Sequence, residues 1–124
     1  MGGIRPERVA ERVQREVTDI LTRKLRDPRL LAVTVTDVEV TADLKLATVF
    51  VSTLSAGPER EAALTALKRA APRVRRELAP RLSLREVPEV RFRFDESVER
   101  GARVEDLLRR LKSGEPVEDD ESTW

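Results

Sequence analysis

The chain of 124 residues is 40% apolar and 38% charged, a composition that predicts one globular domain with a densely charged surface. Its net charge of +1 conceals an asymmetry, because residues 113–124 carry five acidic residues and no base, which leaves residues 1–112 with a net charge of +6. The lack of histidine and cysteine excludes disulfides, thiolate metal sites and the commonest general base, and no apolar run approaches the ~20 residues of a membrane span.

Residues 4–26 are predicted to form the first helix. Its apolar residues recur at spacings of three and four and form one stripe that can face a core: Val9, Val13, Val17, Ile20, Leu21 and Leu25. Arginines follow the same spacing on roughly the opposite face, and four of them are a candidate phosphate-binding surface: Arg5, Arg8, Arg12 and Arg15. The alternative is an ordinary solvated face with weak ion pairs, because Glu16 and Asp19 dilute the positive charge.

Two strands joined as a hairpin are predicted next. Asp27-Pro28-Arg29 ends the first helix, since the residue before a proline is disfavoured in the α region. The segment 30–40, rich in valine and threonine, predicts a strand, and its apolar residues change parity midway, which predicts a bulge near Thr36-Asp37. A turn at 41–43 leads into a second strand over 44–53.

Residues 64–84 have a helical pattern that is interrupted at Ala70-Ala71-Pro72. Proline cannot donate a backbone hydrogen bond and disfavours α dihedrals in the residue before it, so we expect two helices, the second starting at Pro72. The unpaired N–H groups of that helix start would attract phosphate oxygens. The basic residues around the break are candidate phosphate ligands: Lys68, Arg69, Arg73, Arg75, Arg76, Arg81 and Arg85. The alternative is a bare corner between helices with a solvated face, which is what charge runs usually form.

The last part of the chain predicts one more strand and one more helix. Residues 89–95 alternate apolar residues with arginines, as in a half-buried strand, and Ser97 can cap a helix that extends to Leu111. The order is α-β-β-α-α-β-α, an α+β fold in which helices cover one face of a three-stranded sheet, with a single domain over residues 1–112. Residues 113–124 form an acidic tail that is predicted to be disordered. This tail either keeps the protein soluble or folds back on the arginines and competes with weakly bound RNA.

The chain has few kinds of residue that could serve as a catalytic nucleophile or base. A nucleophile would have to be serine or threonine with a lysine or carboxylate base, and no motif or spacing places such groups together. We therefore expect no enzymatic activity, no metal and no other cofactor. The chain has no tyrosine, and Phe92 and Phe94 share the apolar face of their strand, which favours recognition of folded RNA through phosphates and shape over stacking on single strands.

The order of elements and several short motifs resemble the ribosome-binding factor A family, which has a KH-like domain of type II topology. The matching landmarks keep their order and spacing over residues 5–111: Arg8-Val9, Asp27-Pro28-Arg29, Val33 to Val40, Asp43-Leu44, Ala47, Val49 to Ser52, Leu67, Arg75, Pro88-Glu89, Phe92 and Asp95. No single landmark is diagnostic, but their order and spacing together are specific.

The resemblance implies a small cytoplasmic protein that binds the immature small ribosomal subunit and its rRNA. It implies ribosome biogenesis as the process, with a role in late maturation, in processing of the five-prime end of the small-subunit rRNA and in cold adaptation. Ribosomal proteins and a ribosome-associated GTPase that aids release are further implied partners, and no membrane is involved. We expect a monomer, because the sequence predicts no long exposed apolar stripe of the kind that forms a subunit interface.

One position departs from the family pattern. Ordinary RNA-binding KH domains use a Gly-x-x-Gly loop between two helices, and this chain has no glycine at its predicted break. The family resembled here has an interrupting Ala-x-Gly kink, and the matching positions are Ala70, Ala71 and Pro72, with proline where glycine is usual. Proline still predicts a break, but it removes an N–H and the open space that glycine leaves.

Two other functions stay open on the sequence alone. One is an adaptor whose charged helices dock an acidic protein, and the other is a general KH-type RNA binder unconnected with ribosomes. RNase-sensitive co-sedimentation with ribosomal particles would distinguish a ribosome-binding factor from an adaptor. A preference for precursor subunits would distinguish it from a general RNA binder.

Overall fold

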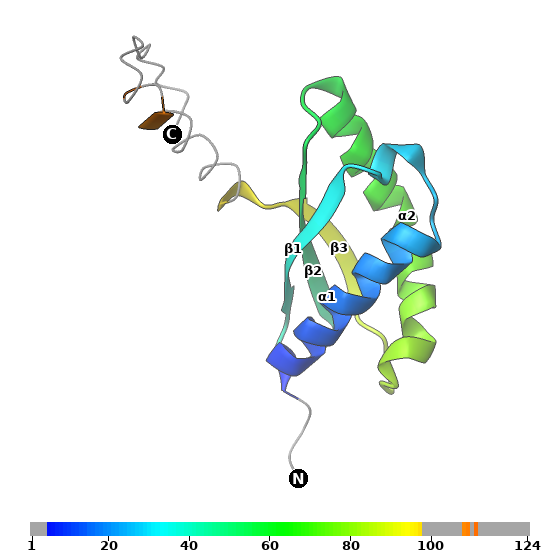
Figure 1. Cartoon of the computed structure of the whole chain (residues 1–124). Helices are drawn as coiled ribbons and strands as arrows, with labels where there is room; N and C mark the ends of the chain where they lie inside the picture. Colours follow the sequence, from blue (N-terminus) through cyan, green and yellow to red (C-terminus); the bar gives the residue numbers. More distant parts are fainter. Residues whose placement is uncertain (1–4, 98–107, 110, 112–124) are drawn as a thin grey trace. The chain divides into compact units, whose positions relative to one another are not determined.

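The structure, a computed structural model, describes residues 5–97, 108, 109 and 111 (Figure 1). Its elements follow in the order α1 (Pro6–Arg23), the 3-10 turn η1 (Pro28–Leu30), β1 (Val33–Val40), β2 (Leu46–Thr53), α2 (Pro58–Leu82) and β3 (Glu89–Phe94). The chain divides into two compact units, residues 1–94 and residues 95–124, and all six elements belong to the first. The expected α+β class is confirmed.

The predicted last helix, from Ser97 to Leu111, falls largely outside the described residues. Residues 97, 108, 109 and 111 are helical, and the predicted tail over 113–124 lies outside the described residues entirely. The expected domain boundary at residue 112 therefore stays a prediction.

The three-stranded sheet is mixed, with β2 between β1 and β3. β1 and β2 form the predicted antiparallel hairpin, whereas β3 runs parallel to β2 because α2 returns the chain to the other end of the sheet before β3 begins. The register shifts between Val35 and Asp37, which confirms the predicted bulge. This shift lets Val38 and Val40 contact the same core as Val33 and Val35, although the two pairs differ in parity.

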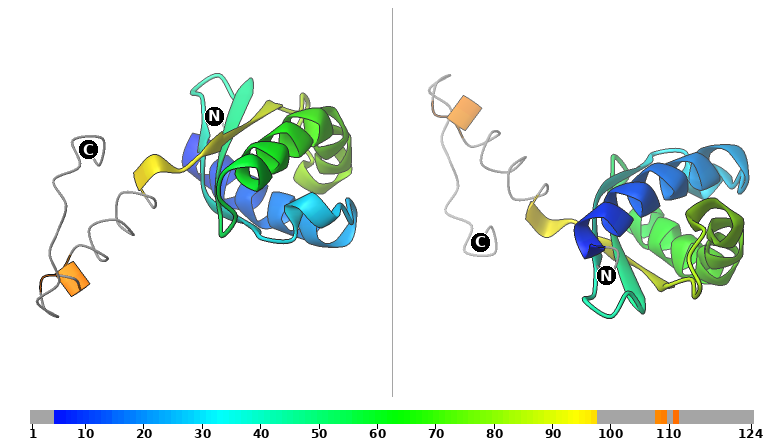
Figure 2. Two further views of the ribbon diagram at one scale, coloured as in Figure 1. Left: turned by 90° about the horizontal axis from the view of Figure 1, so that it is seen from above. Right: turned by 90° about the horizontal axis from the view of Figure 1, so that it is seen from below.

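Both helices cover the same face of this sheet, as predicted (Figure 1, Figure 2). Burial of their apolar stripes against the strands holds the layers together, at roughly 1.5–3 kcal/mol for each large side chain that is removed from water. Both helices and the central strand contribute fully enclosed apolar residues: Val13, Val17 and Ile20 of α1, Ala47, Val49 and Val51 of β2, and Leu67, Val74 and Leu78 of α2.

α2 is one uninterrupted helix, so the predicted break at Ala70-Ala71-Pro72 is wrong. Its buried stripe continues on both sides of the proline, with Leu67 before it and Val74 after it. Pro72 itself lies on the exposed side, where water can replace the N–H that the carbonyl of Lys68 loses. Packing along the whole stripe therefore outweighs the local cost of a proline in a helix interior, which is about 3 kcal/mol.

This correction changes the expected site as well as the fold. One helix, and not two, connects β2 to β3, so no helix starts at Pro72 and no free N–H groups are offered to phosphate there. Any attraction for phosphate in this region must come from the basic side chains of α2.

A short turn replaces the beginning of the predicted first strand. Asp27 accepts a hydrogen bond from the backbone N–H of Arg29 (2.9 Å) and forms an ion pair with its guanidinium (2.7 Å), which holds η1 in place. The side-chain hydrogen bond from Arg29 lowers the pKa of Asp27 below its ordinary value. β1 consequently begins at Val33, three residues later than predicted.

Candidate nucleic-acid interface

Apart from Arg5 and Arg85, which lie just outside the helices, the arginines that were predicted as two separate surfaces lie on two neighbouring helices of one face. α1 and α2 contact each other over the sheet and run in opposite directions (Figure 2). Near the start of α1, Arg12 donates a hydrogen bond to the carbonyl of Arg81 at the end of α2 (Nη2 to O, 3.0 Å). At the end of α1, the carbonyl of Lys24 accepts one from Arg73 (3.2 Å). The partners lie 69 and 49 residues apart in sequence, so no local pattern could indicate that these surfaces join.

Three arginines form a row along the outward side of α2. Arg69, Arg73 and Arg76 are exposed and follow spacings of four and three, opposite the buried Leu67 and Leu78. Within the described part of the chain, neither Arg69 nor Arg76 forms an ion pair. The row therefore presents positive charge that no described residue neutralises by an ion pair. Lys68, also exposed, extends it.

Two arginines of α2 bind backbone carbonyls. Arg75 donates from Nε and Nη2 to the carbonyl of Val87 at 3.2 and 2.9 Å, and Arg73 donates to that of Lys24. A carbonyl carries no net charge, so both guanidinium groups keep their positive charge while their positions become restricted. The contact of Arg73 also places a cation at the C-terminal end of α1, where the helix dipole favours one.

Arg81 differs from the other members of the set because its charge is matched internally. Its Nη1 lies 2.7 Å from Oδ2 of Asp19 and 3.1 Å from Oε1 of Glu16, and its side chain is only 21% exposed. The hydrogen bond from Arg81 lowers the pKa of Asp19, and the same bond raises the pKa of Arg81. Asp19 also pairs with Arg23 at 3.0 Å. We therefore treat Arg81 as part of the contact between α1 and α2 and leave it out of the proposed binding surface.

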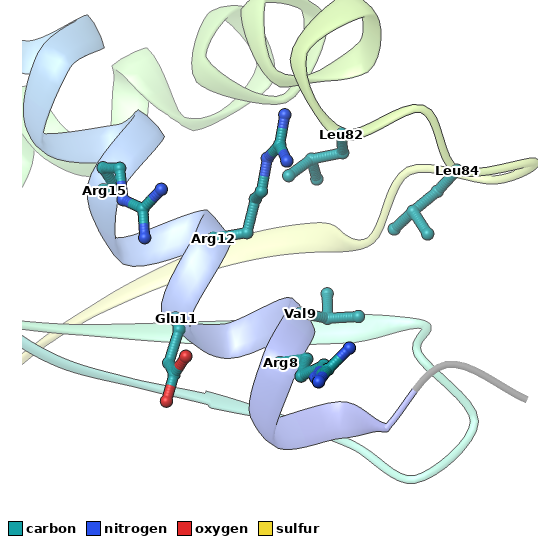
Figure 3. A pocket seen from close by; sticks show the side chains of 7 residues that line it. All are labelled: Arg8, Val9, Glu11, Arg12, Arg15, Leu82 and Leu84. Carbon is teal, nitrogen blue, oxygen red and sulfur yellow. The ribbon is translucent and has the colours of Figure 1, made fainter.

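A cavity of about 340 Å³ opens between the first half of α1 and the end of α2 (Figure 3). In Figure 3, Leu82 and Leu84 stand across from Val9 and Arg12. Seven residues line it: Arg8, Val9, Glu11, Arg12, Arg15, Leu82 and Leu84. The sequence indicates the arginines of this cavity but neither leucine, because an apolar residue at a helix end carries no local sign of a binding site.

The last two predicted residues, Arg5 and Arg85, are exposed and make no side-chain hydrogen bond or ion pair with other described residues. Across the described ranges, no group of three or more acidic side chains is placed to hold a metal ion. No helix in those ranges is long and apolar enough to cross a membrane. The chemistry offered by this face is thus cationic hydrogen bonding, which suits phosphate oxygens.

A mixed three-stranded sheet with both helices on one face defines an α+β, KH-like domain, and its helical layer carries a basic surface. The family model of ribosome-binding factor A matches residues 5–108. The chain belongs to this family.

Solved structures share the fold. The crystal structure of ribosome-binding factor A from Thermus thermophilus is 29% identical, with a TM-score of 0.65 over 73% of this chain and 96% of that one. A Thermus thermophilus homology model, fitted into a cryo-EM map of a 30S complex with the factor, is 30% identical, with a TM-score of 0.60 over 70% of this chain and 91% of that one. A Thermotoga maritima protein solved by NMR is 34% identical, with a TM-score of 0.57 over 73% of this chain and 91% of that one.

Proposed function

We propose that this chain binds the small ribosomal subunit through rRNA phosphates and assists the maturation of that subunit. The observation that carries the proposal is the family match over residues 5–108. The Thermus thermophilus factor, which was fitted into a map of a 30S complex, gives it further support. The protein acts by occupying a site on the subunit, and it needs no bond chemistry of its own.

The proposed contact surface is the outer side of the two helices. Arg69, Arg73 and Arg76 of α2 would hold backbone phosphates, with Arg8 and Arg15 of α1 as the second part of the surface. Arginine suits this role because its planar guanidinium donates two parallel hydrogen bonds to one phosphate. Phe92 is buried in the core, which leaves shape and phosphate positions as the main features that such a surface reads.

The proposal extends to the stage at which the protein acts. We infer that the target is the immature subunit in the cytoplasm. Binding would support late maturation of this subunit and five-prime processing of its rRNA. It would also support growth in the cold. Departure would follow completion of the subunit, with ribosomal proteins and a release GTPase as further partners. The protein would act as a monomer.

Sedimentation of the tagged chain with purified subunits tests this function. We expect it to travel with precursor small subunits, to bind mature subunits less tightly, and to be released by RNase. Recovery of an acidic protein in place of ribosomal particles, from lysate treated with nuclease, would indicate an adaptor. Equal affinity for precursor subunits, mature subunits and arbitrary structured RNA would indicate a general RNA binder.

A further inference from the structure

The cavity between α1 and the end of α2 has an apolar floor. Val9 of α1 and Leu82 of α2 are buried, and Leu84 is partly buried beside them (Figure 3). Ser83, between the two leucines, has a left-handed conformation (φ 53°) that ends α2 and turns the chain, so that both leucines line the same cavity. The volume of about 340 Å³ lies at the lower end of the range of small-ligand sites, roughly 300–1,000 Å³.

Three guanidinium groups line the cavity around this floor. Arg8, Arg12 and Arg15 follow one another at spacings of four and three along α1, and none of them forms an ion pair with another described residue. Arg12 is held across the cavity by its hydrogen bond to the carbonyl of Arg81. The cavity therefore combines an apolar surface with a cationic wall.

None of the acidic residues of α1, Glu7 included, forms an ion pair with these arginines. Glu16 and Asp19 form ion pairs with Arg81, at 3.1 and 2.7 Å. Glu11 contributes to the lining, but Figure 3 shows its carboxylate turned away from the leucines. The ion pairs that hold α1 to α2 thus leave the arginines of the cavity available to a ligand.

We propose that this cavity binds one unstacked nucleotide of RNA, with the base against the leucines and the adjoining phosphates on the arginines. The proposal rests on the function proposed above and names the part of the RNA that this surface receives. A nucleobase has two apolar faces and is joined through ribose to phosphates on both sides, which matches an apolar floor within a cationic wall. Guanidinium planes also stack on bases.

The geometry restricts which RNA segments can be bound. A base that is stacked and paired in a duplex cannot enter a concave site, so the nucleotide must come from a loop, a bulge or a junction. The cavity thereby adds a base contact to a surface for which only phosphate and shape contacts were predicted.

NMR titration of the full chain, labelled at its leucine and valine methyl groups, tests the proposal directly. The probe is a short single-stranded oligoadenylate, and the control is an oligonucleotide of the same length without bases. We expect the methyl resonances of Leu82, Leu84 and Val9 to shift with oligoadenylate, because a bound base has a ring current, and to stay unshifted with the abasic strand. Leu31 and Leu54, which are 83% and 96% exposed and lie outside the cavity, serve as internal references.

A pair of matched substitutions separates base binding from general charge. Leu84→Glu places a carboxylate at the cavity without removing a fully buried side chain, and Leu54→Glu makes the same change at an exposed position elsewhere. We expect Leu84→Glu to weaken oligoadenylate binding about tenfold, the lower end of what stacking of one base contributes, and Leu54→Glu to weaken it less than about twofold. Thermal unfolding of both variants checks that each is folded.

The inference is overturned if abasic RNA binds as tightly as oligoadenylate, or if the two glutamate variants bind alike. The proposed function would survive that result, provided that the unmodified chain still sediments with small subunits. Methyl shifts without such sedimentation would support the nucleotide site and contradict the ribosomal role. A phosphopeptide that shifts the same methyl groups at lower concentration than the RNA would show that the cavity binds a protein ligand instead.

Discussion

At the scale of single residues, the arginines of α2 differ in the groups that they contact. Arg81 is held by two carboxylates, Arg75 by a backbone carbonyl, and Arg69 and Arg76 by no described residue. Arg69 and Arg76 can offer all of their N–H groups to phosphate, whereas Arg75 offers only those that are not bound to the carbonyl. Removal of Arg69 and Arg76 should therefore affect binding and not stability, whereas removal of Arg81 should do the reverse.

The double substitution Arg69→Ala with Arg76→Ala is expected to weaken binding to small subunits and to reduce its salt dependence. Each lost phosphate contact lowers the slope of log affinity against log salt by about 0.7–0.9. Measurement of the dissociation constant over a range of salt concentrations checks this. The matched control is Arg91→Ala with Arg93→Ala, because both arginines are exposed on β3 and alternate with the buried Val90 and Phe92. Equal slopes for the two double variants would contradict the assignment of the α2 row.

Arg81→Ala is expected to lower the melting temperature at neutral pH, and to do so less in acid. The hydrogen bond from Arg81 lowers the pKa of Asp19 from its ordinary value of 3.8, so folding favours the ionised carboxylate. The resulting stability is present above the unfolded pKa and is lost as the pH falls through the lower folded value. Thermal scans from neutral pH to below pH 3.8 should show the difference between wild type and variant shrinking.

Arg85→Ala is the control for that experiment, because Arg85 is exposed and has no described partner. It should leave the melting temperature nearly unchanged at every pH, since isolated surface charges contribute little. A destabilisation by Arg81→Ala that is the same at all pH values would show that Arg81 acts through packing and not through its charge.

At the scale of elements, α2 carries both the core stripe and the basic row. Its interior contains two prolines, Pro72 and Pro80, and both lie on the exposed side. This placement keeps the lost backbone hydrogen bonds in contact with water and leaves the buried stripe intact. The continuity of α2 is therefore a product of its packing on the sheet.

Replacement of Pro72 by alanine tests this view of α2. Alanine restores one helical hydrogen bond and removes a cost of about 3 kcal/mol, and the greater freedom of the unfolded chain offsets about 0.4–1 kcal/mol of that gain. We expect the free energy of unfolding in urea to rise by about 2–2.6 kcal/mol. A loss of stability in Pro72→Ala would mean that the fold requires a distortion at this point. Pro80→Ala, at the second exposed proline, should give a gain of the same sign.

At the scale of the whole molecule, charge is divided unevenly between residues 1–112 and residues 113–124. Residues 113–124 carry five acids and no base, and residues 1–112 have a net charge of +6. Acidic residues that can reach the basic helices would compete with weakly bound RNA, because the attraction acts over about a Debye length.

Deletion of residues 113–124 is expected to raise the affinity for unrelated structured RNA at low salt, since the net charge changes from +1 to +6. The gain should vanish at high salt, where exposed charges are screened. Binding isotherms at two salt concentrations check both statements. Unchanged affinity at low salt would assign the acidic residues to solubility alone.

Features that depend on local periodicity could be predicted from the sequence. The valine stripe of α1, the alternation along β3 and the bulge near Asp37 could be predicted because each follows from which neighbours share a face. The family could also be inferred, since its landmarks occur in order along the chain.

The other features depend on contacts between residues that are distant in sequence. The helix runs through Pro72 because Leu67 and Val74 are buried against the same core, and local rules for proline take no account of that packing. The carboxylates that hold Arg81 and the arginines that face Leu84 come from a helix more than 60 residues away in sequence. Which charges remain available to RNA depends on which elements come together in space, and a one-dimensional pattern of charge contains no record of such contacts.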